Sequence, residues 1–189
     1  MKKLLTTAIM IFALISSLQA EELKGHLTKM SITDINGVNY EISGTEEGMK
    51  FKGLEDKVII LEFFGHKCPP CIASIPNLIK LQKEYKDKLA IIAIEVQGYT
   101  NKKLQEFAKD NKLNYITVAG EKANSFIEYI SQRAEWRGSI PFTVGMDTKG
   151  DVQFIEVGMV PYPLLEEHVK KLSKKIVAKA KIVTKIETK

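Results

Sequence analysis

Apolar residues recur along this chain with two different periods, and the change of period predicts its elements. On both sides of Asn36-Gly37 they occupy every second position, which predicts a β-hairpin. Residues 58–64 and 89–96 form almost continuous apolar runs, which are typical of strands covered on both faces of a sheet. Shorter strands are expected at residues 115–118, 142–146 and 152–157, with a turn joining the last two.

Between these strands, apolar residues recur at the spacing of one helix face. The pattern predicts helices from the segment after residue 68 to about residue 86, from residue 101, over residues 121–132 and from Pro163. Thr100 can cap the second helix, and Pro163 can open the last because an N–H in the first turn has no partner. Together the elements predict an α/β fold, with a central mixed β-sheet flanked by helices and an N-terminal β-hairpin.

Residues 1–20 have the features of an export signal. Lys2 and Lys3 precede a mostly apolar run over residues 4–18, and Ala20 offers a small residue for cleavage. The run is shorter than the ~20 residues of a membrane-spanning helix, which favours a cleaved signal. Leu18 stands where the usual cleavage site has a small residue, so an uncleaved anchor is the alternative. Export predicts a location in the periplasm or cell envelope, where disulfides persist.

The formal net charge of +5 is concentrated at one end of the chain. Residues 170–189 hold eight lysines and one glutamate, a local charge of +7 that leaves −2 for residues 1–169. We therefore expect a mildly acidic domain at residues 21–173 and a basic tail or helix extension at residues 174–189. Apolar residues at helical spacing in the tail predict peripheral contact with an anionic membrane, and a solvated tail is the alternative. No aromatic residue interleaves the lysines, so nucleic-acid binding is not expected.

The two cysteines, in the stretch GHKCPPCIASIP, are the candidate chemical centre. A structural zinc site needs four ligands, and only His66 is near Cys68 and Cys71 in the sequence, so a metal site is not favoured. A bridge across a two-residue gap constrains little chain, so a stabilising role is not favoured either. A Cys-x-x-Cys pair at a helix start favours redox chemistry, with the disulfide as the redox group and no separate cofactor.

The start of that helix gives the physical reason for redox chemistry. The first N–H groups lack partners and point at Cys68, and the helix dipole adds partial positive charge, so the pKa of Cys68 is expected to be low. Pro69 and Pro70 fall in the first turn, where they stiffen the chain without losing a hydrogen bond. We expect an accessible Cys68 to attack a partner's disulfide and a deeper Cys71 to resolve the mixed disulfide.

Three neighbouring residues bear on this chemistry. Lys67 is expected to add positive charge beside Cys68, and His66 either tunes Cys68 or is solvated. A carboxylate inside the first apolar run is costly to bury as an ion, so Glu62 is expected to have a raised pKa. From a buried strand Glu62 can lie beneath Cys71 and accept its proton. The alternative places Glu62 at a sheet edge, in contact with water.

Several spacings together carry a family resemblance. A carboxylate, Glu62, stands six residues before Cys68, and Pro76 stands five residues after Cys71. A D-x-x-G sequence occurs at residues 34–37 and a P-x-T-x-x-x-D-x-x-G sequence at residues 141–150. By these motifs residues 27–172 resemble the thioredoxin superfamily and, within it, the exported TlpA/ResA-like thiol–disulfide oxidoreductases.

The resemblance implies a substrate site beside the cysteines. It implies that the Ile140-Pro141 bond is cis, that Pro141 packs against the disulfide and that the backbone of Ile140 pairs with bound substrate. Pro69, Pro70 and Trp136 are further candidates for the substrate surface, with packing against a helix as the favoured alternative for Trp136. Four positions depart from the family: Lys67 replaces a usual Trp, Glu62 stands where many members have Asn, Phe142 replaces the Glu of the cytochrome-maturation branch, and Gly98 replaces an acidic residue.

The Pro-Pro dipeptide resembles that of the TlpA-like reductases, and the chain lacks room for the helical insertion of DsbA-like oxidases. We therefore expect a periplasmic reductant of protein disulfides, with apocytochrome c as a candidate substrate and a membrane electron donor of the DsbD/CcdA type. Two alternatives stay open. One is a dithiol oxidase, which the charge of Lys67 favours and Glu62 opposes. The other is a non-catalytic module that holds an extended peptide near Pro141.

Overall fold

The computed structural model describes residues 28–173. The export signal predicted for residues 1–20 and the basic tail predicted for residues 174–189 lie outside the described residues. Within residues 28–173, no helix combines the length and the apolar character needed to cross a bilayer.

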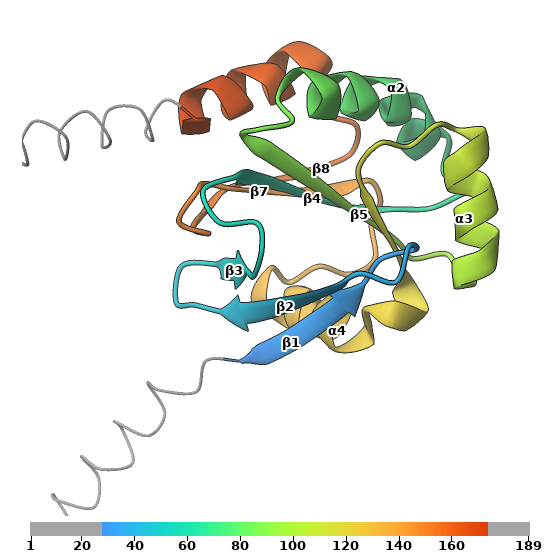
Figure 1. The fold of residues 1–189 in the computed structure, drawn as a ribbon, viewed down its shortest axis with the longest axis horizontal. Coiled ribbons are helices and arrows are strands. Elements are labelled where there is room, and N and C mark those ends of the chain that lie inside the picture. Colours follow the sequence, from blue (N-terminus) through green and yellow to red (C-terminus); the bar gives the residue numbers. More distant parts are fainter. Residues whose placement is uncertain (1–27, 174–189) are drawn as a thin grey trace, which may run out of the picture.

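The centre of the molecule is a five-stranded sheet with the strand order β6-β5-β4-β7-β8 (Figure 1). The middle strand β4 pairs in parallel with β5 and antiparallel with β7. β5 and β6 are parallel, and β7 and β8 are antiparallel. The strand bounds are β4 (Val58–Phe64), β5 (Leu89–Glu95), β6 (Ile116–Ala119), β7 (Phe142–Met146) and β8 (Val152–Val157). The predicted mixed sheet is thus confirmed.

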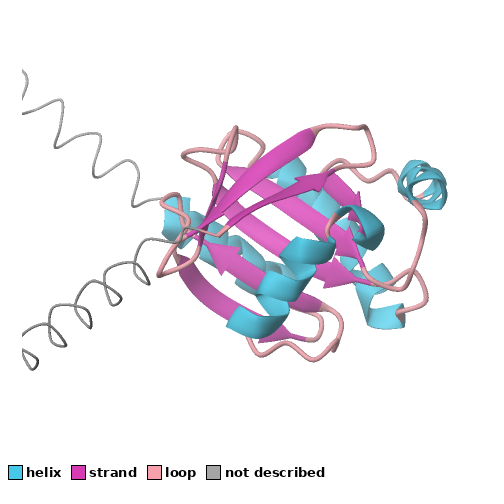
Figure 2. Cartoon of the chain, turned by 90° about the horizontal axis from the view of Figure 1, so that it is seen from below, coloured by secondary structure: helices cyan, strands magenta, loops and turns pink. Residues whose placement is uncertain are grey.

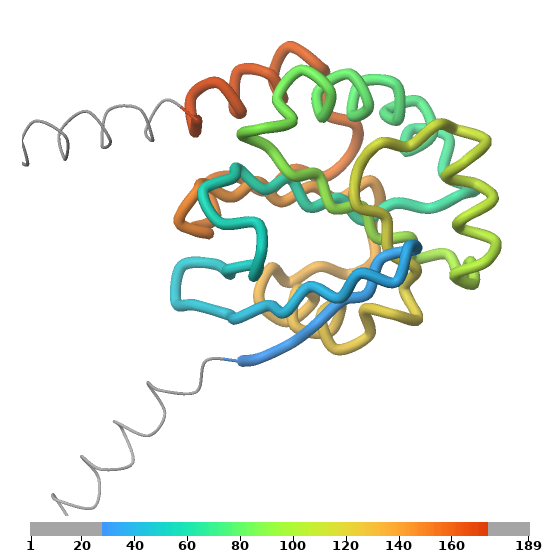
Figure 3. Tube along the Cα trace, viewed as in Figure 1, coloured from blue at the N-terminus to red at the C-terminus, as the bar shows by residue number. Residues whose placement is uncertain are grey.

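Helices cover both faces of this sheet (Figures 1 and 2). One face carries α2 (Pro69–Glu84) and a helix over residues 162–173. The opposite face carries α4 (Asn124–Arg133) together with a small antiparallel sheet, and the trace in Figure 3 shows the first strand of that sheet beside α4. The small sheet consists of β1 (Lys29–Thr33), β2 (Asn39–Gly44) and β3 (Met49–Phe51). α3 (Asn101–Asp110) lies against β6.

Strand β4 is buried at all seven positions, because its side chains alternate between two apolar layers. The layer under α2 and residues 162–173 includes Val58, Ile60, Leu78, Leu81, Leu89, Ile91, Leu165 and Val169. The layer under α4 and the small sheet includes Ile32, Ile42, Phe51, Ile59, Leu61, Phe63, Ile92, Phe126 and Ile130. Since even-numbered β4 positions face α2, Glu62 also points toward that helix.

The predicted hairpin, the four longer strands and the Thr100 cap are confirmed, and three details differ. Strand β3 was not expected, because three residues are too short to show a period. The helix predicted for residues 121–132 is divided into a 3₁₀ turn (Gly120–Lys122) and α4, with Ala123 at φ −140° and ψ 16° between them. The last helix begins at Tyr162, which places Pro163 at the second helical position, where an N–H still has no helical partner.

The hairpin turn depends on one buried carboxylate. Asp34 is 5% exposed, and its Oδ1 accepts hydrogen bonds of 2.8 Å from the backbone N–H groups of both Asn36 and Val38. Gly37 adopts a φ of 86°, a conformation that glycine reaches without a Cβ penalty. The D-x-x-G motif is therefore a turn motif, in which the acidic residue holds the chain and the glycine reverses it.

We predict that Asp34→Ala lowers the free energy of unfolding by about 1–3 kcal/mol, because it leaves two backbone N–H groups without an acceptor. Asp34→Asn keeps one oxygen at this place and should lose less. Urea denaturation of both variants measures the difference. Equal losses for the two variants would show that the turn does not depend on this acceptor.

Candidate active site

The two cysteines lie where β4 ends and α2 begins. Cys68 is the N-cap residue of α2, and Pro69 and Pro70 occupy its first two positions. The backbone N–H of Cys71 donates to Sγ of Cys68 over 3.3 Å, so one of the free N–H groups of the first turn is directed at this sulfur. The two cysteines form a disulfide with a Cα–Cα distance of 5.2 Å.

Cys68 is more exposed than Cys71, as expected, but Cys68 is less exposed than the sequence suggested. Cys68 is 6% exposed and Cys71 is 1% exposed. Pro69 and Pro70, in contrast, are exposed. In the disulfide form, the leading cysteine therefore exposes only a small part of its surface, and it is not the open side chain that the sequence suggested.

The loop before β7 approaches the disulfide from the other side. Because β7 runs antiparallel to β4, its first residues lie at the edge where β4 ends. The carbonyl oxygen of Ile140 lies 3.9 Å from Sγ of Cys68, and the Ile140–Pro141 peptide bond is cis. Sequence positions separated by 72 residues thus meet at one end of the sheet.

Trp136 packs on aromatic residues of the central sheet. Its ring lies 4.7 Å from the ring of Phe63 and 5.6 Å from that of Phe142, between centroids. The indole N–H donates to the carbonyl oxygen of Ser139 over 2.7 Å. Trp136 therefore supports the loop that leads to Ile140, and its half-buried position leaves part of its surface open beside that loop.

Glu62 lies on the middle strand of the sheet and is 4% exposed, which excludes the position at a sheet edge. Burial raises the pKa of its carboxyl to about 7, and a hydrogen bond from Ser74 opposes that rise. The hydroxyl of Ser74 lies 3.1 Å from Oε1 of Glu62 and 2.8 Å from the carbonyl oxygen of Cys71. Ser74 links the carboxyl to the helix turn of the second cysteine, a role that the sequence did not indicate.

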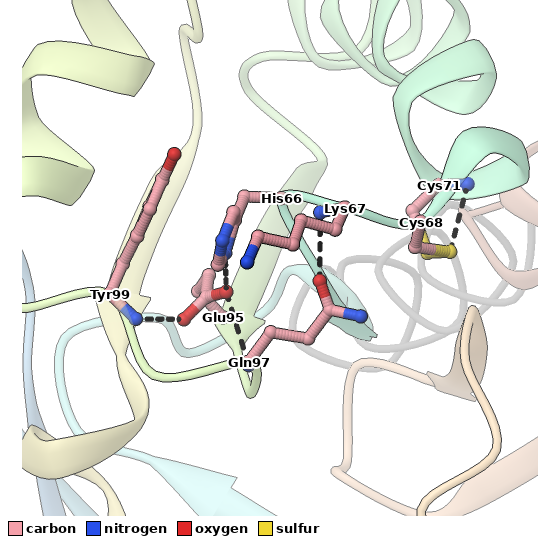
Figure 4. Close-up of polar contacts among 7 residues, drawn as sticks. All are labelled: His66, Lys67, Cys68, Cys71, Glu95, Gln97 and Tyr99. Carbon is pink, nitrogen blue, oxygen red and sulfur yellow. Dashed lines mark hydrogen bonds and ion pairs between the residues drawn. A yellow bond between two sulfur atoms is a disulfide. The ribbon is translucent and has the colours of Figure 1, made fainter.

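A second buried carboxylate, Glu95, fixes the loop in front of the cysteines (Figure 4). Glu95 is fully buried at the end of β5, and its Oε1 lies 2.7 Å from Nδ1 of His66. The same carboxylate accepts from the backbone N–H groups of Gln97 (3.1 Å) and Tyr99 (2.9 Å). The imidazole stacks on the ring of Tyr99 with centroids 3.6 Å apart. The side chain of Gln97 in turn accepts from the backbone N–H of Lys67 over 2.7 Å.

This arrangement changes the interpretation of the basic residues. The His66 side chain is neither solvated nor directed at the sulfurs, because it is held between Glu95 and Tyr99. Figure 4 shows the Lys67 side chain turned back toward His66 and away from the disulfide. The backbone N–H groups of α2 are therefore the nearer source of positive potential at Cys68.

Outside the cysteine pair, the described residues form no metal cluster but do line a hollow. Within residues 28–173, no three His, Cys, Asp or Glu side chains gather as a metal site would require. A hollow of about 660 Å³ opens between the small sheet and the β7–β8 turn, and its walls include Ile59, near the start of β4. One strand length, roughly 20 Å, separates that end of β4 from the cysteines. The hollow contains neither His nor Cys in its walls, so it does not belong to this site.

Comparison with known proteins agrees with the fold and the cysteine pair. Residues 33–155 match the AhpC/TSA family. The chain belongs to this family. It is 28% identical over 123 residues to the thioredoxin-like protein YneN of Bacillus subtilis, covering 64% of this chain and 68% of that protein. It is 26% identical over 132 residues to the thiol-disulfide oxidoreductase ResA of Halalkalibacterium halodurans, covering 69% and 71%.

Solved structures of this kind share the fold. A thioredoxin-family thiol:disulfide interchange protein from Chlorobium tepidum superposes with a TM-score of 0.61 at 22% identity, covering 77% of this chain and 93% of that one. The resemblance to TlpA/ResA-like proteins and the predicted thioredoxin fold are thereby confirmed.

We predict that the free energy of unfolding of the wild type falls between pH 4.5 and about 7, and that Glu62→Gln abolishes this fall. The carboxyl has a pKa of about 7 in the folded chain and about 4.5 when exposed, so the folded state holds its proton longer. The contribution is fully present below pH 4.5 and is lost as pH rises through 7, by about 3 kcal/mol in total. Urea denaturation of the oxidised chain from pH 4.5 to 8.5 measures it. Glu106→Gln, at an exposed carboxyl of α3, is the matched control and should leave the pH dependence intact.

We predict that Glu95→Ala loosens the loop in front of the cysteines. The change leaves the imidazole of His66 and two backbone N–H groups without their acceptor, at a cost of about 2–4 kcal/mol of unfolding free energy. Hydrogen exchange should become faster at the amides of Gln97 and Tyr99. Glu121→Ala removes an exposed carboxylate that accepts one backbone N–H, that of Asn101. Because water can replace this exposed acceptor, the change should cost less than about 1 kcal/mol. Similar losses in both variants would contradict the role of Glu95.

Proposed function

We propose that this chain is an exported thiol–disulfide oxidoreductase that reduces protein disulfides through Cys68 and Cys71. The observation that carries the proposal is the position of this disulfide, at the N-terminus of α2 and 3.9 Å from the carbonyl oxygen of Ile140. A helix N-terminus stabilises a thiolate, and a nearby backbone carbonyl offers an acceptor to an extended substrate strand.

In the proposed reaction, the reduced Cys68 attacks first because it caps α2. Its thiolate attacks one sulfur of the substrate disulfide, and a mixed disulfide forms while the other substrate sulfur leaves as a thiolate. Cys71 then attacks Sγ of Cys68, which releases the second substrate thiol and closes the Cys68–Cys71 bond. Cys71 needs to lose its proton for this step, and the buried Glu62 is the candidate acceptor.

The substrate surface in this proposal lies around the exposed part of Cys68. Pro69 and Pro70 form its exposed wall on α2, and Ile140 with Pro141 forms the wall on the β7 side. The partly open ring of Trp136 extends the second wall. Two backbone segments and few charged groups make up this surface, which suits an extended peptide of varied sequence more than a small charged molecule.

The direction of electron flow is proposed from the residues around the sulfurs. Neither His66 nor Lys67 directs its charge at the disulfide, and a carboxyl lies behind it, so little extra positive charge stabilises the reduced form. Stabilisation of the reduced thiolate is what makes a strong oxidant. We therefore favour a reductant, which a dithiol donor in the membrane keeps reduced. Relatives named thiol-disulfide oxidoreductase support the reaction class.

We predict that the full chain accelerates the reduction of insulin disulfides by dithiothreitol and that Cys68→Ser returns the rate to background. Cys71→Ser should instead accumulate a mixed disulfide with insulin, because Cys68 can still attack but nothing resolves the adduct. Thiol trapping in the native envelope should find the pair mostly reduced. A pair that is mostly oxidised there would favour the oxidase, and a wild type without any rate would favour the peptide-binding module.

A further inference from the structure

The hydroxyl of Ser74 lies between two acceptors. Its Oγ is 3.1 Å from Oε1 of Glu62 and 2.8 Å from the carbonyl oxygen of Cys71. A hydroxyl carries one hydrogen and two lone pairs, so it donates to one of these groups at a time and can accept in the other direction. Ser74 and Glu62 are each 4% exposed, so this local geometry decides how the carboxyl is hydrogen-bonded.

The two protonation states of Glu62 require opposite orientations of this hydroxyl. An ionised carboxylate only accepts, so Ser74 must donate to it. A protonated Glu62 carries an O–H that can donate to Oγ of Ser74, and the hydroxyl hydrogen of Ser74 then returns to the Cys71 carbonyl. Both states keep the carboxyl hydrogen-bonded, and only one O–H bond rotates between them.

Ser74 is the hydrogen-bond partner of the Glu62 carboxyl. The neighbouring strand positions are Ala93 on β5 and Thr143 on β7. Cys71 on α2 lies one helical turn before Ser74, and Tyr115 ahead of β6 is a phenol whose pKa is raised by burial and by the charge of Glu62. Among the described residues, Ser74 makes the one hydrogen bond to the Glu62 carboxyl, and this bond favours the ionised form, whereas burial disfavours it.

We propose that Ser74 is a positioning residue of the dithiol reaction, whose hydroxyl turns between the Cys71 carbonyl and Glu62 and so holds the carboxyl ready to exchange a proton with Cys71. This proposal rests on the proposed function. Ser74 lies in the second turn of α2, outside the Cys-x-x-Cys motif.

Resolution of the mixed disulfide moves one proton to Glu62 and two electrons to the substrate. In the mixed disulfide, the Cys71 thiol gives its proton to the Glu62 carboxylate, and the hydroxyl of Ser74 turns to the Cys71 carbonyl as the new O–H of Glu62 donates to it. The Cys71 thiolate forms a bond to Sγ of Cys68, and the bond between Cys68 and the substrate sulfur breaks. The substrate leaves as a thiolate and takes a proton from solvent, so the two electrons of the dithiol have passed to the substrate disulfide.

The test measures the carboxyl and the reaction separately in the full chain. Carbon-13 NMR of the Glu62 carboxyl in the oxidised protein measures its titration midpoint, and its burial predicts a wild-type pKa of about 7. Ser74→Ala should raise that midpoint by about one to two pH units, since it removes a hydrogen bond to the charged form. Ser74→Gly deletes the same hydroxyl and should give the same shift. Ser74→Thr keeps a hydroxyl and should return the midpoint toward the wild-type value.

The rate of mixed-disulfide resolution should follow the carboxyl. For a midpoint raised by one unit, the ionised fraction at pH 7 falls about fivefold, so resolution should slow about fivefold there and recover by pH 9. In a Glu62→Gln background, Ser74→Ala should cause no further change in the pH profile. Ser131→Ala is the matched control, because the Ser131 hydroxyl also donates over 2.8 Å to a backbone carbonyl of its own helix, α4, which covers the sheet face opposite to Glu62.

The outcomes separate this proposal from the proposed function. A Ser74→Ala midpoint and pH profile equal to those of the wild type would overturn the role of Ser74, whatever the activity. A wild type that reduces no disulfide would overturn the proposed function and with it the reaction step, while the NMR midpoint would still decide whether Ser74 controls Glu62. A loss of stability with an unchanged midpoint would mean that Ser74 serves only the helix.

Discussion

A carboxyl group in the middle of a fully buried strand is the constraint on which this site depends. β4 is buried at every position, and Glu62 is its one ionisable residue. Burial of a carboxylate is unfavourable unless a donor stabilises the ion or a proton neutralises it. Within residues 28–173 the carboxyl has one hydrogen bond, from the Ser74 hydroxyl, and burial raises its pKa to about 7, so both of its forms are accessible near neutral pH. That balance suits a group that exchanges a proton with a neighbouring thiol.

The remaining parts of the site follow from the directions of three strands. β4 and β5 are parallel, so their carboxyl ends bring the loop with His66 next to Glu95. β7 is antiparallel to β4, so the residues that enter it arrive at the same edge and bring Ile140 to Cys68. One braced loop and one facing loop thus enclose the disulfide. The small exposure of Cys68 is a consequence of this enclosure.

The sequence predicted those features of the site that can be recognised from residues close together in the chain. The cysteine pair, the carboxylate six residues earlier and the capping Thr100 are of this kind, and so is the α/β order of elements. Ser74 was not predicted, because a serine in a helix has no special pattern until the strand beneath it is known. Glu95 was not predicted either, since its partner His66 is 29 residues away and the two meet only through the parallel register of Phe64 with Glu95. The sequence also predicted that His66 and Lys67 add positive charge at Cys68. Both side chains point elsewhere, because adjacency in the sequence does not fix the direction of a side chain.

The meeting of Cys68 with Ile140 across 72 residues also has a consequence for biosynthesis. During synthesis from the N-terminus, the dithiol leaves the ribosome well before the strand that carries its facing loop. Until β7 inserts beside β4, the cysteines have a helix start behind them but nothing opposite with which to select a client. The substrate surface beside the dithiol is thus complete only after β7 has paired with β4.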